Sequence, residues 1–572
     1  MAKFLIGVLT GVILTGLVLV IGIFAIAHMR EKPPAIAEGS TLVLELEGEI
    51  PEKAPVEFPI PFLEQRTPPT VTDLWATLRK AAADNRIKAI VFEPRDLAVG
   101  WGKLEEMRGD LENFRKSGKP IYAYLKTPSA REYYLATAAT RIYMDPEDEL
   151  DLKGMRFELT YFKKTADKLG VQVEIEHAGK YKDFGDMFTR TSMSPETKDV
   201  LTSIIDDLYG NLVRRIAEGR KKTPDEIRAT IDQGPFLSPH AKEQGLIDGL
   251  LYEDQMYDEI KAKLNDGDLK KVALRDYLRV PAPGPVGKQR IALVTAEGGI
   301  SRGDGGSDFS GDNGIESEGF DKLLRRVGND DGVKGVIVRI DSPGGEVFAS
   351  DAIWREMNLL SKKKPLVISM SDTAASGGYY IAMTGDPVVA YPGTFTGSIG
   401  VVFGKANLHG LYDKLGVTKD LLTRGRYADI DSDYGPLSAD GHAKLRQAID
   451  EDYRSFVGKV AAARRRKFEE IEPLSQGRVW LGSQAKANGL IDELGGLDRA
   501  LDLVKEKAKI PKSQRVTLVT YPPKRTIFDL LFGQTAEGAM ESRLRGVLKA
   551  WQVRLWARGG MMRLMPYSIN VR

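Results

Sequence analysis

The chain has 572 residues, 28% of them charged and 42% hydrophobic, which is a globular composition long enough for several domains. A formal net charge of +2 gives no support for a nucleic-acid partner. The absence of cysteine excludes disulfides, thiolate nucleophiles and cysteine-ligated metals. The five histidines are scattered without metal-ligand spacing, so we expect no metal and no other cofactor.

The first predicted element is a membrane anchor within residues 1–30. Residues 4–27 carry no charge and, at about 24 residues, are long enough to cross a hydrocarbon core of ~30 Å. Ala25-Ile26-Ala27 resembles a cleavage site, but the apolar run is longer than the core of a signal peptide. We therefore expect an uncleaved, single-pass transmembrane helix. Basic residues on both sides leave its orientation open.

The sequence that follows contains an internal repeat. The sequence DKLGV at 167–171 returns at 413–417, and other matches follow in the same order about 246 residues apart. One of these matches aligns Tyr133-Tyr134 with Tyr379-Tyr380. A collinear series of this kind indicates two homologous repeats. The predicted boundaries are 40–265 for the first repeat, 280–287 for a Pro/Gly-rich linker, 288–508 for the second repeat and 509–572 for a tail.

Each repeat alternates strand and helix patterns. KAIVF (88–92) in the first repeat, and GVIVRI (335–340) and PLVISM (365–370) in the second, are short apolar runs rich in β-branched residues. Helical patterns precede or follow them. This alternation predicts an α/β fold made of parallel βαβ units with right-handed crossovers.

The two repeats differ at places that carry chemistry. Ser376, in SDTAASGGYY, aligns with Ala130, whereas Lys182, in GKYKD, aligns with Ala428. The glycine loop DSPGGEVFAS of the second repeat aligns with a segment that lacks Pro-Gly-Gly. A purely structural duplication gives no reason for this reciprocal loss, but a catalytic site divided between the repeats does.

The residue types fit acyl transfer. A serine hydroxyl such as that of Ser376 needs an adjacent base, and Lys182 serves as one only if burial lowers its pKa enough to keep the amine neutral. Ser376 is predicted at a helix N-terminus, where the N–H of Gly377 would stabilise an oxyanion. Gly344 or Gly345, after the neighbouring strand, is the candidate for the second donor.

Each of these residues also has a structural interpretation. Ser376 in this context is also explained as an ordinary helix N-cap, and Lys182 as a solvated surface lysine. Lys180 is the residue most easily confused with Lys182. His177 is near in sequence, but nothing places an acid beside it, so a Ser-His-Asp triad is not expected.

The motifs together resemble those of signal peptide peptidase A in its long, tandem-repeat, membrane-anchored form. They are DSPGGEVFAS, SDTAASGGYYIAM, TGSIGV and GKYKD, and they occur in the family's order. The resemblance extends from the apolar N-terminus to about residue 508. It implies a hydrolase, a serine peptidase with a Ser/Lys dyad, on two tandem crotonase- and Clp-protease-like repeats.

By this resemblance Ser376 is the nucleophile, Lys182 is the general base, and the hydroxyl of Ser398 in TGSIG orients the lysine amine. The implied substrates are cleaved signal peptides and other short unfolded peptides, with small or aliphatic residues preferred near the cut. The implied partners are the lipid bilayer and further copies of the chain in a bowl-shaped tetramer. The implied location is the bacterial inner membrane, with the catalytic part on the periplasmic face.

The tail and two other functions complete the sequence-based expectations. Residues 509–572 have no recognisable counterpart in the first repeat, and 540–556 combine apolar residues at helical spacing with flanking arginines. This pattern predicts either a basic amphipathic helix on the membrane or a terminal helix docked on the protein. The alternative functions are an inactive membrane scaffold of the same fold and a crotonase-type acyl-CoA enzyme.

Overall fold

The computed structural model describes most of the chain between residues 33 and 523 and a short segment near the C-terminus. The described ranges are 33–55, 68–264, 267, 269–284, 287–303, 314–523 and 560–565, with the single residues 7, 11, 14 and 15. The predicted anchor helix over 4–27 falls almost entirely outside them, as does the predicted helix over 540–556. Within the described ranges, no helix has the length and apolar character needed to span a membrane.

The first repeat is built on a parallel sheet with the strand order β8-β4-β3-β2-β1-β9. All neighbouring strands in it are parallel, which confirms the prediction of βαβ units. Every residue of β3 is buried, as expected for a parallel sheet covered on both faces. The strands are β1 (Ser40–Glu47), β2 (Ile87–Arg95), β3 (Ile121–Leu125), β4 (Arg141–Met144), β8 (Gly249–Leu250) and β9 (Lys271–Ala273).

The second repeat has the corresponding sheet, in the order β19-β17-β15-β13-β10-β21, with β16 beside β15 and β20 beside β16. Its pairs are parallel except for β17 with β19. The strands are β10 (Gln289–Glu297), β13 (Val333–Ser342), β15 (Leu366–Ala375), β16 (Val388–Ala390), β17 (Phe395–Gly397), β19 (Val479–Leu481), β20 (Glu493–Leu494) and β21 (Val516–Tyr521).

The tail contains a strand that the sequence comparison did not anticipate. We expected no counterpart in the first repeat for residues after 508, but β21 lies beside β10 as β9 lies beside β1. The statement about the tail is therefore wrong for this part of it. An edge strand is held mainly by backbone hydrogen bonds, so two such strands occupy the same place without similar side chains.

A third sheet joins the two repeats and the tail, in the order β12-β11-β14-β22-β18-β6. β6 of the first repeat pairs antiparallel with the whole of β18 of the second. β22, from the tail, is antiparallel to both of its neighbours, β14 and β18. The strands are β6 (Gln172–Ala178), β11 (Ile300–Ser301), β12 (Ile315–Glu316), β14 (Gly344–Glu346), β18 (Val401–Asn407) and β22 (Gly560–Leu564); β5 (Glu149–Leu150) and β7 (Phe236–Leu237) form a separate pair.

The helices cover the sheets and repeat between the two halves. Those of the first repeat are α2 (Val71–Ala83), α3 (Trp101–Arg115), α4 (Ala130–Ala136), α5 (Lys163–Leu169), α6 (Asp186–Thr189), α7 (Pro195–Arg220), α8 (Pro224–Ile231), α9 (Ser238–Glu243), α10 (Glu253–Leu264) and α11 (Leu274–Leu278). Those of the second are α12 (Ser317–Asn329), α13 (Val347–Lys363), α14 (Gly377–Ile381), α15 (His409–Leu415), α16 (Ala439–Arg464), α17 (Phe468–Ile471), η1 (Glu472–Leu474), α18 (Gly482–Ala487) and α19 (Leu497–Lys507).

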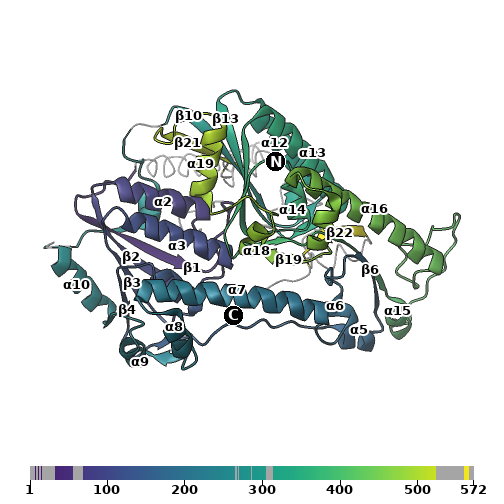
Figure 1. The fold of residues 1–572 in the computed structure, drawn as a ribbon, viewed down its shortest axis with the longest axis horizontal. Helices are drawn as coiled ribbons and strands as arrows, with labels where there is room; N and C mark the ends of the chain where they lie inside the picture. Colours follow the sequence, from purple (N-terminus) through teal and green to yellow (C-terminus); the bar gives the residue numbers. More distant parts are fainter. Residues whose placement is uncertain are drawn as a thin grey trace.

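The longest helices, α7 and α16, have 26 residues each and begin at equivalent serine N-caps, Ser194 and Ser438. Figure 1 shows α7 running from the first repeat toward α5 and α6, below β19 and α18 of the second. An ion pair of 2.7 Å between Asp199 of α7 and Arg478 joins the two repeats along this path. α7 therefore supports both repeats at once.

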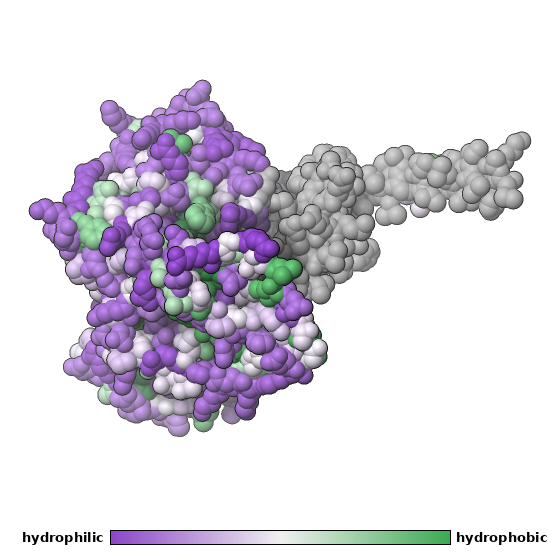
Figure 2. All heavy atoms as spheres, turned by 90° about the vertical axis from the view of Figure 1, so that its right-hand side faces the viewer, coloured by the Kyte–Doolittle hydropathy of each residue, from purple (hydrophilic) through white to green (hydrophobic). Residues whose placement is uncertain are grey.

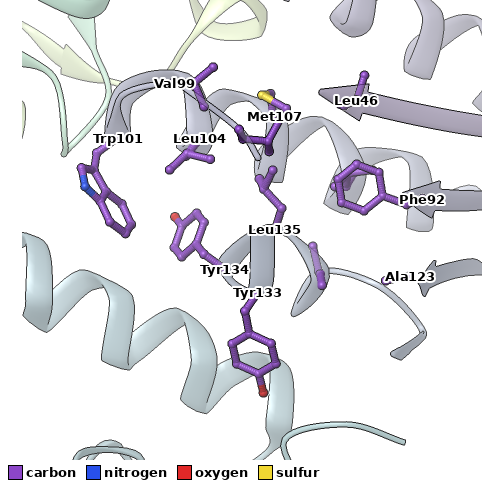
Figure 3. Packing of buried hydrophobic residues seen from close by; sticks show 14 of the residues in the cluster. Leu46, Phe92, Val99, Trp101, Leu104, Met107, Ala123, Tyr133, Tyr134 and Leu135 are labelled. Atoms are coloured by element: carbon purple, nitrogen blue, oxygen red, sulfur yellow. The ribbon is translucent and has the colours of Figure 1, made fainter. Parts of the chain in front are cut away.

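The apolar core continues from one repeat into the other. In the first repeat, Trp101 of α3 packs edge-on against Tyr134 of α4, with ring centroids 5.5 Å apart (Figure 3). Phe395 and Leu481, both from the second repeat, belong to the same buried cluster. Separating the repeats would therefore expose apolar surface that each of them buries.

One face of the exterior is hydrophilic, in contrast to the apolar core. The face drawn in Figure 2 is predominantly hydrophilic, and its hydrophobic residues lie in small, separate patches. Exposed apolar residues of this scattered kind are usual for a protein surface. The large apolar clusters of the described chain lie in its interior, where one of them joins the repeats.

A buried ion network also fixes the repeats to each other. Arg339 of β13 is fully buried, and its guanidinium lies 2.9 Å from Glu52 and 3.0 Å from Glu106, both of the first repeat. Removing one partner of such a network leaves an uncompensated buried charge, which typically costs about 3–5 kcal/mol. The network therefore holds the relative position of the repeats, on which any site between them depends.

Candidate active site

Ser376 lies at a sharp turn between β15 and α14. Its backbone angles, φ 55° and ψ −113°, are outside the regions that non-glycine residues ordinarily adopt. Its N–H donates to the carbonyl of Gly397 at 2.8 Å, but its side chain makes no capping hydrogen bond to α14. The interpretation of its hydroxyl as a helix cap is therefore wrong. A strained serine at a strand-to-helix turn is a known way of presenting a nucleophilic oxygen.

Lys182 reaches this turn from the first repeat. Its Nζ lies 2.9 Å from Oγ of Ser376, 2.8 Å from Oγ of Ser398 and 3.0 Å from the carbonyl oxygen of Ser398. All three residues have an exposed fraction of 0%. The interpretation of Lys182 as a surface lysine is therefore wrong, and the structure brings together the three side chains that the motifs singled out.

A tight turn after β6 sets the position of Lys182. The N–H of Tyr181 donates to the carbonyl of Gln476 at 2.8 Å, which ties the turn to the second repeat. Gly477 faces Lys182 so closely that a Cβ on this glycine, whose φ is 76°, would lie 2.6 Å from Cβ of the lysine. A residue with a side chain at 477 would therefore displace the amine from Ser376.

The surroundings of Lys182 favour its neutral form. Burial lowers its pKa well below the ordinary 10.5, because the ammonium ion would lose its hydration. The neighbouring Asp183 carboxylate opposes this shift, and the Arg563 guanidinium adds to it. Asp183 accepts a hydrogen bond from Oγ1 of Thr197. The net lowering of the pKa leaves an amine that is able to accept a proton.

Ser398 is held in a conformation that turns two oxygens toward Lys182. Its φ of 51° is in the left-handed region, which a serine seldom adopts. Its N–H donates to the carbonyl of Arg478 at 2.7 Å, which fixes this conformation from the opposite side. The amine of Lys182 is thereby oriented by both the carbonyl and the hydroxyl of one residue.

Three glycines converge beside Ser376. A Cβ on Gly344, whose φ is 100°, would lie 2.6 Å from the amide nitrogen of Gly377, and one on Gly377 would lie 3.0 Å from that of Gly345. Backbone nitrogens from two different segments thus lie close together beside Ser376, as an oxyanion site built from N–H groups requires. The N–H of Gly344 already donates to Oγ of Ser342 at 3.2 Å, so Gly345 is the better second donor.

The structure separates the other residues considered from this cluster. Lys180 is exposed, with its amine 4.5 Å from the centroid of the Tyr181 ring. His177 is exposed, with Nδ1 3.0 Å from the carbonyl oxygen of Gly179. Ala428, the counterpart of Lys182, is exposed on a loop. Among the residues that the structure describes, no group of three potential ligands is placed to hold a metal ion.

Sequence reasoning missed two features of the site. Gly477 had a weak signal, because Gln476-Gly477 matches Gln233-Gly234 in the first repeat, but nothing in this match points to Lys182. β22 had no such signal, because it belongs to the tail and no similar segment was recognised in the first repeat. It lies between β14 and β18, with Arg563 opposite Gly345.

Comparison with known families defines the class of protein. Residues 320–394, which include the glycine loop and the Ser376 turn, match the family model "Clp protease". The parallel sheets and this match define a Clp-protease-like α/β fold. A second model, "Peptidase family S49", matches residues 113–266 and again residues 358–511. The chain therefore belongs to peptidase family S49 and carries the family's region twice.

Named relatives agree with this assignment, and together with the family match they show that the protein is a serine peptidase. The chain is 34% identical over 506 residues to "Serine protease SPPA, chloroplastic" of Arabidopsis thaliana, covering 87% of this chain and 74% of the relative. It is 31% identical over 459 residues to "Protease 4" of Haemophilus influenzae, covering 75% and 72%. It is 34% identical over 212 residues to "Putative signal peptide peptidase SppA" of Enterococcus faecium, covering 37% and 61%.

Proposed function

We propose that this serine peptidase works through a dyad of Ser376 and Lys182, one residue from each repeat. The observation that carries the proposal is the buried contact of 2.9 Å between Nζ of Lys182 and Oγ of Ser376. The lowered pKa of the amine supports the role of general base, and the strained turn at Ser376 supports that of nucleophile. Ser398 is proposed to orient the amine.

In the proposed reaction, Oγ of Ser376 attacks the scissile carbonyl carbon while its proton passes to the neutral amine of Lys182. The carbonyl oxygen becomes an oxyanion, which the N–H groups of Gly377 and of Gly345 or Gly344 stabilise. The C–N bond then breaks, and the lysine ammonium gives its proton to the leaving amine. Water hydrolyses the ester in the same way: its proton passes to Lys182, the C–O bond breaks and Ser376 regains a proton.

We further propose that the substrates are cleaved signal peptides and other short unfolded peptides. Support comes from the name of the Enterococcus faecium relative and from the site, since a buried serine accepts only an extended segment. The apolar, uncharged residues 4–27 support anchoring as a single-pass helix in a bacterial inner membrane, with the catalytic part on the periplasmic face. Assembly of several copies, in the tetramer that the family resemblance implies, belongs to the same proposal.

Labelling with a fluorophosphonate probe, followed by peptide mapping, tests the catalytic assignment directly. We expect a single adduct on Ser376, its loss in Ser376→Ala, and strong reduction in Lys182→Ala. An unlabelled Ser376 in a folded protein that also cleaves no peptide would favour the inactive scaffold. Turnover of an acyl-CoA thioester without peptide cleavage would favour the crotonase-type alternative.

A further inference from the structure

The chain's own strand β22 fills the space beside the nucleophile. It is antiparallel to β14, where Arg563 is opposite Gly345, and antiparallel to β18, where Met562 is opposite Val402. Proteins that bind extended peptides often add them as a strand between exposed edges in this manner. The gap between β14 and β18 therefore has the form of a peptide-binding groove, and residues 560–564 occupy it.

The backbone of Arg563 passes the point where the glycine N–H groups converge. A Cβ on Gly344 would lie 2.0 Å from the carbonyl oxygen of Arg563 and 2.6 Å from the amide nitrogen of Gly377. Two residues further along the chain, the N–H of Met565 donates to the carbonyl of Pro343 at 2.8 Å. The carbonyl of Arg563 thus lies where the carbonyl of a scissile bond would meet its oxyanion donors.

The side chain of Arg563 is buried next to this point, in a space that we call the Arg563 pocket. It is 1% exposed, and its guanidinium makes a two-point contact with the carboxylate of Asp452 on α16, at 2.5 and 3.2 Å. The guanidinium carbon lies 3.6 Å from the centroid of the Tyr380 ring, four residues after the nucleophile on α14. Phe456 forms a second aromatic wall at 5.2 Å.

This pocket has the chemistry of a cation-binding site. A planar guanidinium is matched by a carboxylate that accepts two hydrogen bonds and by an aromatic face, and the Asp452 carboxylate is mostly shielded from water. An uncharged side chain in the pocket would leave Asp452 without its partner. Neighbouring residues Met562 and Leu564 instead pack in an apolar cluster with Phe184 and Val402. Of these three side chains of β22, Arg563 is therefore the one with a charged partner.

We propose that the Arg563 pocket receives the substrate side chain directly before the cut, that Asp452 makes it selective for arginine and lysine, and that β22 is a built-in occupant that substrates displace. The proposal rests on the proposed function, because it takes Ser376 as the nucleophile. It replaces, for the residue before the cut, the expectation of small or aliphatic residues near the cut, which took no account of Asp452.

The first experiment measures kcat/KM for fluorogenic peptides that differ only in the residue before the cut. Citrulline, which has the shape of arginine without its charge, is the matched comparison. We expect the arginine peptide to be cleaved about 10-fold or more faster than the citrulline peptide, and Asp452→Asn to abolish this ratio. Asp450→Asn, an exposed change of the same charge on α16, should leave the ratio unchanged. Equal rates for the two peptides would overturn the proposal.

The second experiment tests whether β22 blocks the groove until a substrate displaces it. Arg563→Glu places a carboxylate against Asp452 and should release β22, so kcat/KM for the arginine peptide should rise several-fold and amide hydrogen exchange at 560–565 should accelerate. Arg563→Gln is a milder variant that should act in the same direction. A fall in activity for both variants, with unchanged thermal stability, would show that β22 supports the site and does not block it.

A binding measurement separates this proposal from the catalytic one. The peptide Gly-Met-Met-Arg-Leu-Met, labelled for fluorescence anisotropy, is titrated into the full chain carrying Ser376→Ala and Arg563→Glu, which cannot cleave it. We expect it to bind about 10-fold or more tightly than its citrulline analogue, and Asp452→Asn to remove the difference. Equal affinities would overturn the pocket assignment, whatever the outcome for catalysis.

Discussion

The turn after β3 and the turn after β15 occupy the same place in two copies of one fold, yet they use a serine in opposite ways. Ser129 has ordinary extended backbone angles, and its hydroxyl caps α4 together with Glu132. Ser376 has a strained backbone, makes no cap, and directs its hydroxyl to Lys182. Strain, rather than the presence of a serine, therefore distinguishes the turn that carries the proposed nucleophile from the turn that only caps a helix.

The framework around these turns is the same in both repeats. The hydroxyl of Tyr133 donates to the carbonyl of Leu246 at 2.7 Å, and that of Tyr379 donates to the carbonyl of Leu490 at 2.7 Å. Arg220 pairs with Asp248 in the first repeat as Arg464 pairs with Asp492 in the second. With the proposed dyad, the scaffold is duplicated and the chemistry is not, so each repeat needs to keep only the part of the site that it supplies.

The largest expected effect comes from removing either half of the divided site. Ser376→Ala and Lys182→Ala should each lower kcat/KM by about 10³-fold or more, because the nucleophile and its base act as a unit. The measurement is peptide hydrolysis by purified protein, with circular dichroism to verify folding. Lys180→Ala is the matched control and should stay active, since its amine is exposed. Activity retained in either dyad variant would mean that the site lies elsewhere.

Moving the lysine between the repeats should not restore activity. Ala428→Lys in the Lys182→Ala background puts an amine at the equivalent position of the second repeat, but this position is on an exposed loop. We expect less than about 1% of wild-type kcat/KM, because proton transfer needs the amine at hydrogen-bond distance from the hydroxyl.

Adding Ala130→Ser to Ala428→Lys in an otherwise wild-type chain should create at most a weak second site. The first repeat lacks the Pro-Gly-Gly loop that would supply oxyanion donors.

Substantial recovery from the lysine at 428 in the Lys182→Ala background would show that the serine and lysine of one repeat meet, and would contradict the geometry across the repeats.

A smaller effect is expected from the glycine that faces the base. Gly477→Ala should lower kcat/KM by about 10–100-fold, because its Cβ would push Lys182 away and a misplaced group loses much of its effect. Gly416→Ala is the matched control: its φ is 71°, but nothing lies within 4 Å of the added Cβ. The control should lose some thermal stability and no activity, so equal losses of activity in both variants would exclude an effect through Lys182.

The mildest test varies pH and leaves the protein unchanged. Because burial lowers the pKa of Lys182, its neutral form should be reached well below the ~10.4 of a free lysine. log kcat/KM should therefore rise with unit slope as the pH approaches this lowered pKa and should level off above it. A plateau that begins only near pH 10 would mean that the amine of Lys182 is hydrated like that of a surface lysine. The proposed difference between Lys182 and a surface lysine would then be wrong.

Much of the fold followed from local patterns and from the internal match. Short apolar runs such as 335–340 predicted buried parallel strands, because a strand covered on both faces has no polar side. The collinear matches predicted the duplication that the two S49 regions confirm. Ser376, Lys182 and the glycine loop were singled out by what the repeats do not share, and Ser398 by the family resemblance; their catalytic roles stay predictions for the experiments above.

Contacts between distant segments could not be predicted in the same way. The pairing of β6 with β18, the network around Arg339 and the contact of Arg563 with Asp452 each join segments with no pattern in common. The strain at Ser376 could not be predicted either, because the same sequence pattern fits a serine that caps a helix and a serine with a strained backbone. Such features depend on the assembled structure, and a single sequence offers no signal for them.

The crossing of β6 onto β18 has a consequence for the time at which the enzyme becomes active. Lys182 precedes Ser376 by 194 residues, and the contact between them exists only after the first repeat has met the second. At a synthesis rate of about 5–20 residues per second, this separation corresponds to roughly 10–40 s. During that interval the proposed base is present without the proposed nucleophile and without the burial that makes its amine neutral, so the proposed dyad cannot cut the nascent chain or its neighbours.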